Sequence, residues 1–210
     1  SGGIRVVDEL NNRTFCDLTT DSTVTVVEAG MAPGGCPQVV VDKKFKGAGF
    51  VVRLTWRVEP TCLAWTAQLR MARGPGRSVR IVFIVPQPSN RLWGPMADPF
   101  IDLQPEQPVM IRHGLAHGRA VASQKRAVPV PLLSFIRQKR SMAVALPVEI
   151  PNVLVRFMNN ADEAHVNVMN SLTYTPDQRP CFKVCYDFLG LRPGRPTTAG
   201  VLISPHDGPW

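Results

Sequence analysis

Two segments that alternate between apolar and polar residues constrain the fold of this chain more than any other feature. In residues 62–71 the apolar positions of the alternation are Leu63, Trp65, Ala67, Leu69 and Met71. A period of two residues is typical of a β-strand with one buried face. Residues 79–85 keep this period but are also apolar at Val82 and Ile84, which predicts a strand covered on both faces. Gly74-Pro75-Gly76 supplies a turn between the two segments, so the sequence predicts a hairpin.

Similar short apolar runs recur between loops rich in proline, glycine and asparagine. They occupy residues 23–27, 38–41, 142–148, 153–157, 165–169, 182–188 and 201–204. The 20 prolines and 16 glycines have no period, and only residues 50–56 are compatible with one or two helical turns. We therefore predict an all-β fold, an eight-stranded antiparallel jelly-roll β-sandwich with long proline-rich loops.

The size of the chain bounds its domain organisation. With 210 residues and 44% hydrophobic content it can bury one sizeable core. We expect a single domain over residues 1–210, with residues 1–20 as an N-terminal arm and residues 190–210 as a C-terminal surface extension. No apolar stretch approaches the length of about 18 residues that a membrane span needs, and no signal-peptide pattern opens the sequence, so we expect neither feature.

The charge of the chain predicts a polyanionic partner. The net charge is +8 and the isoelectric point is about 9.7, values that favour RNA, DNA or an acidic membrane surface as partner. The candidate RNA or subunit contacts form three clusters: Lys43, Lys44 and Lys46; Arg73 and Arg77; and Arg137, Lys139 and Arg140. Each cluster taken alone is equally compatible with solvated strand ends that prevent aggregation of sheet edges.

No pattern in the sequence predicts catalysis, a cofactor or a metal site. His113 and His117 would share one face of a helix, but a glycine follows each of them and no acidic third ligand is near. Acidic residues are dispersed, and neither a nucleophile elbow nor a phosphate-binding loop is present. The five cysteines fit a reducing compartment, and we expect Cys181 and Cys185 to be buried thiols.

The order of features from Phe50 to Gln87 resembles the small jelly-roll capsid subunit of plant picorna-like viruses, the comovirus and secovirus group. An aliphatic segment with Arg and Trp, a strand, a glycine-rich turn and a second apolar strand follow one another in that group, and residues 51–56, 62–71, 74–76 and 79–85 resemble them. Near the C-terminus, "VCYDFLGLRPGRPTTAGVLISP" is similar to the group's last strand and surface stretch. The matching positions there are Tyr186, Asp187, Arg192, Ala199, Gly200 and Leu202. Residues 89–130 depart from the pattern by being longer and richer in proline.

The resemblance implies a structural capsid protein of a small icosahedral positive-strand RNA virus, released from a polyprotein and without catalytic residues. Its partners would be sister jelly-roll subunits and non-specific single-stranded genomic RNA, in the virion and in the host cytoplasm during assembly. Trp93 and Trp210 would then be interface anchors, although packing over its own core explains Trp93 equally well. A β-sandwich binding module for carbohydrate or an anionic ligand, an intracellular RNA-binding protein and a metal-dependent β-barrel enzyme remain as alternatives.

Overall fold

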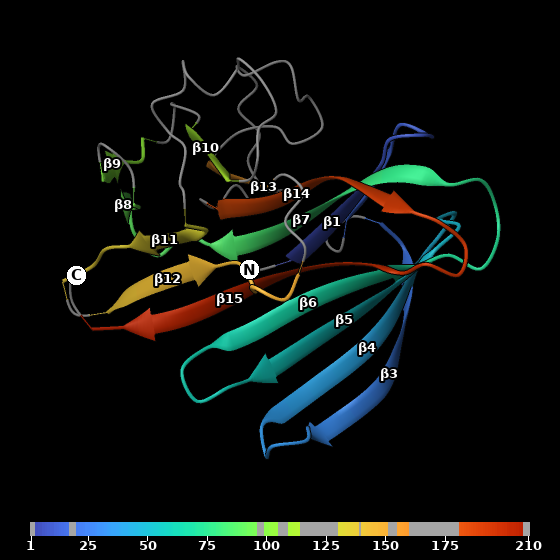
Figure 1. Ribbon diagram of the computed structural model, residues 1–210, viewed down its shortest axis with the longest axis horizontal. Helices are drawn as coiled ribbons and strands as arrows, with labels where there is room; N and C mark the ends of the chain where they lie inside the picture. The colour runs from blue at the N-terminus through green and yellow to red at the C-terminus, as the bar shows by residue number, and fades with distance from the viewer. Residues whose placement is uncertain are drawn as a thin grey trace.

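The computed structural model is an all-β protein built from two antiparallel sheets (Figure 1). It describes residues 3–16, 20–95, 99–104, 109–113, 130–138, 140–150, 155–159 and 181–207. Within these ranges there are fifteen strands and no helix. It follows that the described part has no helix of the length and apolarity that crossing a membrane requires.

The smaller sheet has six strands in the order β10-β13-β14-β7-β1-β2. Their bounds are β1 Gly3–Asp8, β2 Arg13–Cys16, β7 Arg77–Pro86, β10 Val109–His113, β13 Val155–Asn159 and β14 Cys181–Leu191. At its centre β7 pairs with β14, with a bulge between Tyr186 and Leu189. Residues 79–85 are all 0% exposed, so the prediction that both faces of this strand are covered is confirmed.

The larger sheet has nine strands in the order β3-β4-β5-β6-β15-β12-β11-β8-β9. Their bounds are β3 Ser22–Met31, β4 Pro37–Phe45, β5 Val51–Val58, β6 Leu63–Arg70, β8 Arg91–Trp93, β9 Phe100–Asp102, β11 Leu132–Phe135, β12 Ser141–Ala145 and β15 Thr197–His206. β3 to β6 form a meander in which each strand pairs with the next. Figure 1 shows β3 and β4 directed away from the smaller sheet, because the larger sheet is wider.

One hydrophobic core fills the space between the sheets. Trp56 and Trp65 stack at 6.1 Å between ring centroids, and Trp65 meets Phe83 of the other sheet edge-on at 5.0 Å. Phe83 in turn contacts Tyr186 at 6.2 Å. The Tyr186 hydroxyl donates a hydrogen bond of 2.6 Å to the Gly200 carbonyl, which joins β14 of the smaller sheet to β15 of the larger one.

The predicted hairpin around residues 74–76 is wrong, because β6 and β7 lie in different sheets. β7 pairs on one side with β14 and on the other with β1, which leaves it no edge for β6. The turn therefore carries the chain across one end of the sandwich. The predicted helical turns at residues 50–56 are also wrong: residues 51–56 lie in β5, where Val52 and Leu54 alternate with less buried neighbours.

Both predicted appendages contain strands that belong to the sheets. β1 lies within the expected N-terminal arm, yet it sits between β7 and β2, and its Ile4 and Val6 are 0% exposed. β15 lies within the expected C-terminal extension, yet it sits between β6 and β12, and its Val201 is 0% exposed. Their apolar positions alternate over too few residues to separate a central strand from a surface stretch by sequence alone.

The predicted all-β class and the β-sandwich of two antiparallel sheets are confirmed. The jelly-roll connectivity and the count of eight strands are not. The described residues hold fifteen strands, and four successive ones form a single meander in one sheet, whereas a jelly roll is built from Greek keys.

Because the Tyr186 hydroxyl is buried, we expect the free energy of unfolding to decrease at alkaline pH. Burial raises the pKa of Tyr186 above its ordinary value of about 10. The group therefore contributes full stability below pH 10, and this contribution falls by up to about 1.4 kcal/mol per pH unit above it, because only the unfolded chain ionises there. Urea unfolding between pH 8 and pH 11 should show a smaller alkaline loss for Tyr186→Phe than for the unaltered chain. Parallel curves would contradict this expectation.

Candidate anion-binding site

Four connections between strands converge on one end of the sandwich. They are residues 8–13, 45–51, 70–77 and 191–197, and they lie together at the right of Figure 1. Arg13 Nη1 donates to the Gly47 carbonyl at 3.1 Å, and Arg77 Nη1 donates to Asp8 Oδ2 at 2.6 Å. These contacts link the first, second and third connections, so residues far apart in sequence form one surface.

We call this region the basic end because of its cationic side chains. They are Arg13, Lys44, Lys46, Arg70, Arg73, Arg77, Arg192 and Arg195. Lys44, Lys46, Arg73 and Arg77 were predicted from the sequence as candidate contacts, and the structure brings these members of two separate clusters to the same place. Arg70 is in the same basic stretch of the sequence as Arg73 and Arg77, whereas Arg13, Arg192 and Arg195 were missed because their proximity depends on how the connections meet.

A hollow of about 510 Å³ opens within the basic end. Lys44, Arg70 and Arg73 form its charged lining, and the apolar lining comes from Phe45, Ala48, Phe50, Val51 and Ala72. Phe45 and Phe50 belong to the buried core, so the apolar part of the hollow is held in place by the sandwich itself.

Two glycines allow arginines to approach the connection between β4 and β5. Gly47 has a φ of +76°, and a Cβ atom at this position would lie 3.0 Å from Arg13 Nη2. A Cβ atom at Gly49 would lie 3.3 Å from Arg77 Nη2. The Gly-Ala-Gly sequence of this turn is therefore matched to the two guanidinium groups beside it.

Some of these cations are neutralised by carboxylates. Asp42 accepts hydrogen bonds of 2.8 and 2.9 Å from Arg53 and one of 2.8 Å from Arg70. The hydrogen bond from Arg53, aided by Arg70 and opposed by burial, lowers the pKa of Asp42. Asp8, with a side chain 2% exposed, pairs with Arg77.

Lys44 and Arg73 lack such a partner. No carboxylate of the described ranges lies within ion-pair distance of either side chain, and both residues are exposed. Lys46 has only a long contact of 3.8 Å with Asp21, and the two side chains are 82% and 85% exposed. The hollow therefore combines two unpaired positive charges with an apolar wall, an arrangement suited to an anion that carries an apolar part.

The other predicted cations lie elsewhere. Lys43 points to the opposite face of β4 from Lys44, with its Nζ 5.4 Å from the centre of the Phe45 ring. Arg137 and Arg140 are exposed in the connection between β11 and β12. The first residue of β12, Ser141, pairs with His206, the last residue of β15. The basic end instead adjoins Thr197, the first residue of β15. Arg137 and Arg140 therefore lie at the far end of the sheet. Lys139 is outside the described residues.

The two predicted interface anchors are Trp93 and Trp210, and the structure shows neither of them as an exposed aromatic residue. Trp93 is half-buried in β8, where it pairs with Phe100 on one side and with Ser134 on the other. This placement favours the alternative that it packs over its own domain. Trp210 is outside the described residues.

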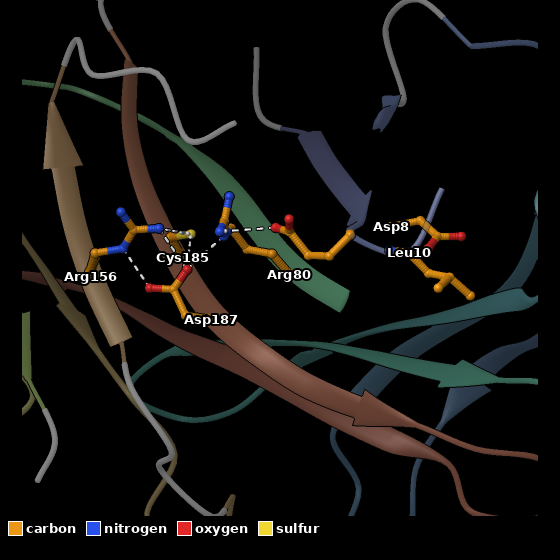
Figure 2. Close-up of polar contacts among 7 residues, drawn as sticks. Asp8, Leu10, Arg80, Arg156, Cys185 and Asp187 are labelled. Atoms are coloured by element: carbon orange, nitrogen blue, oxygen red, sulfur yellow. Dashed lines mark hydrogen bonds and ion pairs between the residues drawn. The ribbon is translucent and has the colours of Figure 1, made fainter. Parts of the chain in front are cut away.

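A buried ion cluster lies on the outer face of the smaller sheet (Figure 2). Asp187 of β14 accepts hydrogen bonds of 2.6 Å from Arg80 Nε and of 2.5 and 2.6 Å from Arg156. These three side chains are at most 2% exposed. Arg80 Nη2 also lies 3.0 Å from Glu9 Oε1, and Cys185 Sγ lies 3.6 Å from both Arg156 and Asp187.

This cluster is structural in character. Burial disfavours the charged form of Arg156, but the hydrogen bond to Asp187 leaves the pKa of Arg156 above its ordinary value. Both carboxylate oxygens of Asp187 already accept hydrogen bonds from buried arginines. This arrangement suits Asp187 to fixing β7, β13 and β14 in register and not to accepting a proton from a substrate. Its signal in the sequence is the presence of charged residues within three largely apolar runs, one each in residues 79–85 and β13 and two, Lys183 and Asp187, in β14. Which runs are neighbours is a property of the fold.

The remaining residues with reactive side chains form no site in the described part of the chain. Cys181 and Cys185 are 3% and 0% exposed, so their predicted burial is confirmed. All five cysteines are free thiols. Among the described residues, no three His, Cys, Asp or Glu side chains are grouped so that they could hold a metal ion. His113 lies in β10, and His117 is outside the described residues.

Comparisons with known proteins identify the fold only. No family model and no curated protein matches the sequence. The α-galactosidase from Lactobacillus brevis aligns with a TM-score of 0.54 and 12% identity over 98% of this chain and 29% of its own. A variant of the α-galactosidase AgaA from Geobacillus stearothermophilus, in complex with stachyose, aligns with a TM-score of 0.55 and 11% identity over 98% and 30%. AgaB from the same organism gives 0.51 and 10% over 98% and 30%. The chain thus spans less than a third of each of these enzymes.

Asp187 and Asp42 offer a matched test of the buried cluster, because each carboxylate lies between two arginines and only Asp187 is buried. Asp187→Asn should lower the free energy of unfolding by about 3–5 kcal/mol, since it leaves charge buried without its counter-ion. Asp42→Asn, with its side chain 24% exposed, should cost about 1 kcal/mol or less. Urea unfolding at neutral pH measures both. Equal losses would show that burial of Asp187 has no energetic consequence.

Proposed function

We propose that this chain is a β-sandwich binding module that holds an anionic ligand at its basic end, without catalysing a reaction. The observation that carries the proposal is the hollow lined by Lys44, Arg70 and Arg73, in which Lys44 and Arg73 have no carboxylate partner among the described residues. Arg70 shares Asp42 with Arg53, so one carboxylate serves two guanidinium groups. Positive charge is therefore in excess within the hollow.

The class of ligand follows from this lining. Arginine presents planar donors that match a phosphate, sulfate or carboxylate group, and lysine adds a point charge. The apolar wall from Ala48 to Val51 suits a ring or chain attached to that group. Arg192 and Arg195, exposed in the neighbouring connection, extend the positive surface beyond the hollow, so an oligomeric anion would gain more than a single group.

A neutral carbohydrate is less well supported as the ligand. Sugar-binding surfaces use exposed aromatic faces, and the Trp56–Trp65 pair instead faces the core, with Trp65 only 6% exposed. The α-galactosidase in complex with stachyose is similar in fold, but at 11% identity the likeness says nothing about ligands of this chain. We therefore take the charged lining as the guide to the ligand.

Matched double variants test the basic end. In fluorescence anisotropy with a labelled heparin oligosaccharide, Lys44→Gln/Arg73→Gln should weaken binding by about tenfold or more and reduce the salt dependence by about two contacts. Arg137→Gln/Arg140→Gln removes the same charge at the far end of the sheet and should change affinity by less than about threefold. Equal effects of the two variants would mean that net charge, and not this site, drives binding.

Our second proposal is that this chain is a structural capsid protein with a jelly-roll fold that assembles with sister subunits. It is supported by the resemblance of residues 50–87 and by an exposed sheet edge at β3 that suits assembly. It predicts that single-stranded RNA of mixed sequence binds as tightly as the sulfated probe, and that electron microscopy of the native source shows particles of uniform diameter containing this chain. Monomers that prefer the sulfated probe would leave the binding module as the better explanation.

A further inference from the structure

β3 is an open edge of the larger sheet. In the part of the chain that the structure describes it pairs with β4 alone, and every one of its ten residues is exposed. Figure 1 shows it as the outermost strand of the meander, on the side away from the smaller sheet. Its free side therefore presents backbone donors and acceptors to any strand that approaches.

The first half of β3 lacks the devices that usually protect a sheet edge. Residues 22–26, Ser-Thr-Val-Thr-Val, contain no charge and no proline, and four of the five are β-branched. A bulge follows between Val26 and Glu28. Because a bulge interrupts regular pairing, the edge available to a second strand is this five-residue segment.

The hydrogen bonding of β4 shows which groups of the segment face outward. Lys46 N donates to Asp21 O at 2.8 Å, which makes Ser22 opposite Phe45 a pair without direct hydrogen bonds. Because the two kinds of pair alternate along an antiparallel ladder, Val24 and Val26 also form pairs with β4 that have no direct hydrogen bonds. The N–H and C=O groups of Ser22, Val24 and Val26 thus point to the free edge.

Two of these residues, Val24 and Val26, carry apolar side chains on the inner face of the sheet, beyond the cover of the smaller sheet. Val24 is 53% exposed and Val26 is 64% exposed, and Val39 of β4 beside them is 41% exposed. The open edge is therefore continuous with an exposed apolar surface.

We propose that a second copy of this chain pairs with β3 about a two-fold axis at Val24. Antiparallel pairing centred there places Val24 against the partner's Val24, Thr23 against the partner's Thr25, and Ser22 against the partner's Val26. Each pair lies on one face of the joined sheet, and the outward groups of Ser22, Val24 and Val26 meet their counterparts. Valine–valine and threonine–threonine neighbours are favourable cross-strand pairs.

Charge distinguishes a second copy from an unrelated strand. The chain has a net charge of +8, so two copies repel unless they meet where charge is low. The segment 22–26 is uncharged, and the antiparallel direction carries the partner's Glu28, the only charged residue of its β3, toward the end of β3 where Lys44 and Lys46 outnumber the single carboxylate of Asp21. A self-complementary edge with this polarity fits an isologous dimer, in which the same patch serves both subunits.

Cysteine cross-linking of the full chain tests the register. Val24→Cys should give a disulfide-linked dimer under mild oxidation, since directly opposed residues of antiparallel strands have Cα atoms about 5.5 Å apart. Val26→Cys should not cross-link to itself, because Ser22 opposes it. A mixture of Ser22→Cys and Val26→Cys should form the mixed dimer. The unaltered chain controls for its free cysteines, and cross-linking of Val24→Cys no greater than that control would overturn the proposal.

Sedimentation velocity tests the association itself. The unaltered chain should form dimers with rising concentration, and Val24→Lys should raise the dissociation constant by about tenfold or more, because two lysines would meet at the axis. Val148→Lys, at a position 93% exposed outside the strands, is the matched control and should leave dimerisation unchanged. Monomers at all concentrations, or dimers indifferent to Val24→Lys, would refute β3 pairing.

Discussion

The sandwich depends on one apolar core that two sheets of unequal width enclose. β7 and β14 supply one wall and β6 with its neighbours supplies the other, so that Trp65, Phe83 and Tyr186 meet in the middle. Each large apolar side chain buried in this way contributes about 1.5–3 kcal/mol to the free energy of unfolding. Apolar burial is non-directional, so the Tyr186–Gly200 hydrogen bond helps to fix the relative position of β14 and β15. Because nine strands face six, the described strands of the smaller sheet leave part of the wider sheet uncovered. The open β3 edge lies on that uncovered part, whereas the hollow at the basic end opens where the connections between strands meet.

The outer face of the smaller sheet, unlike the core, buries charged side chains together with apolar ones. Val82 and Ile84 form a small apolar cluster there with Met158, yet the same face buries Asp187 between two arginines. An ion cluster of this kind seldom adds much to stability compared with apolar residues of equal size. Its value is in discrimination: a shift of β13 or β14 by one residue would leave a guanidinium buried without its carboxylate. At the basic end only the Arg77–Asp8 pair is largely buried; the Arg70–Asp42 pair is partly exposed, and Lys44 and Arg73 have no carboxylate partner among the described residues.

The sequence predicted the strands far better than their partners. Alternation located β6 and β7 to within a few residues and named the side chains that meet in the core, because burial on one face is a local pattern. It could not show that these two strands belong to different sheets, since that depends on which edges β1 and β14 occupy. For the same reason Lys44 and Arg73 were recognised only as members of separate clusters. The alternation that places Lys43 and Lys44 on opposite faces of β4 was available, but a run of lysines hides it.

The position of β15 has a consequence for how the chain reaches its native state. β15 separates β6 from β12, so the nine-stranded sheet stays in two pieces until residues 197–206 have been synthesised. β1 has a similar requirement at the other end of the chain, because its partner β7 follows about seventy to eighty residues later (Asp8 pairs with Val79 and Gly3 with Ile84). Contacts between residues so distant in the chain are costly in loop entropy and slow to form. During translation the β3–β6 meander can form early, whereas the larger sheet can be completed only after β15 has been synthesised.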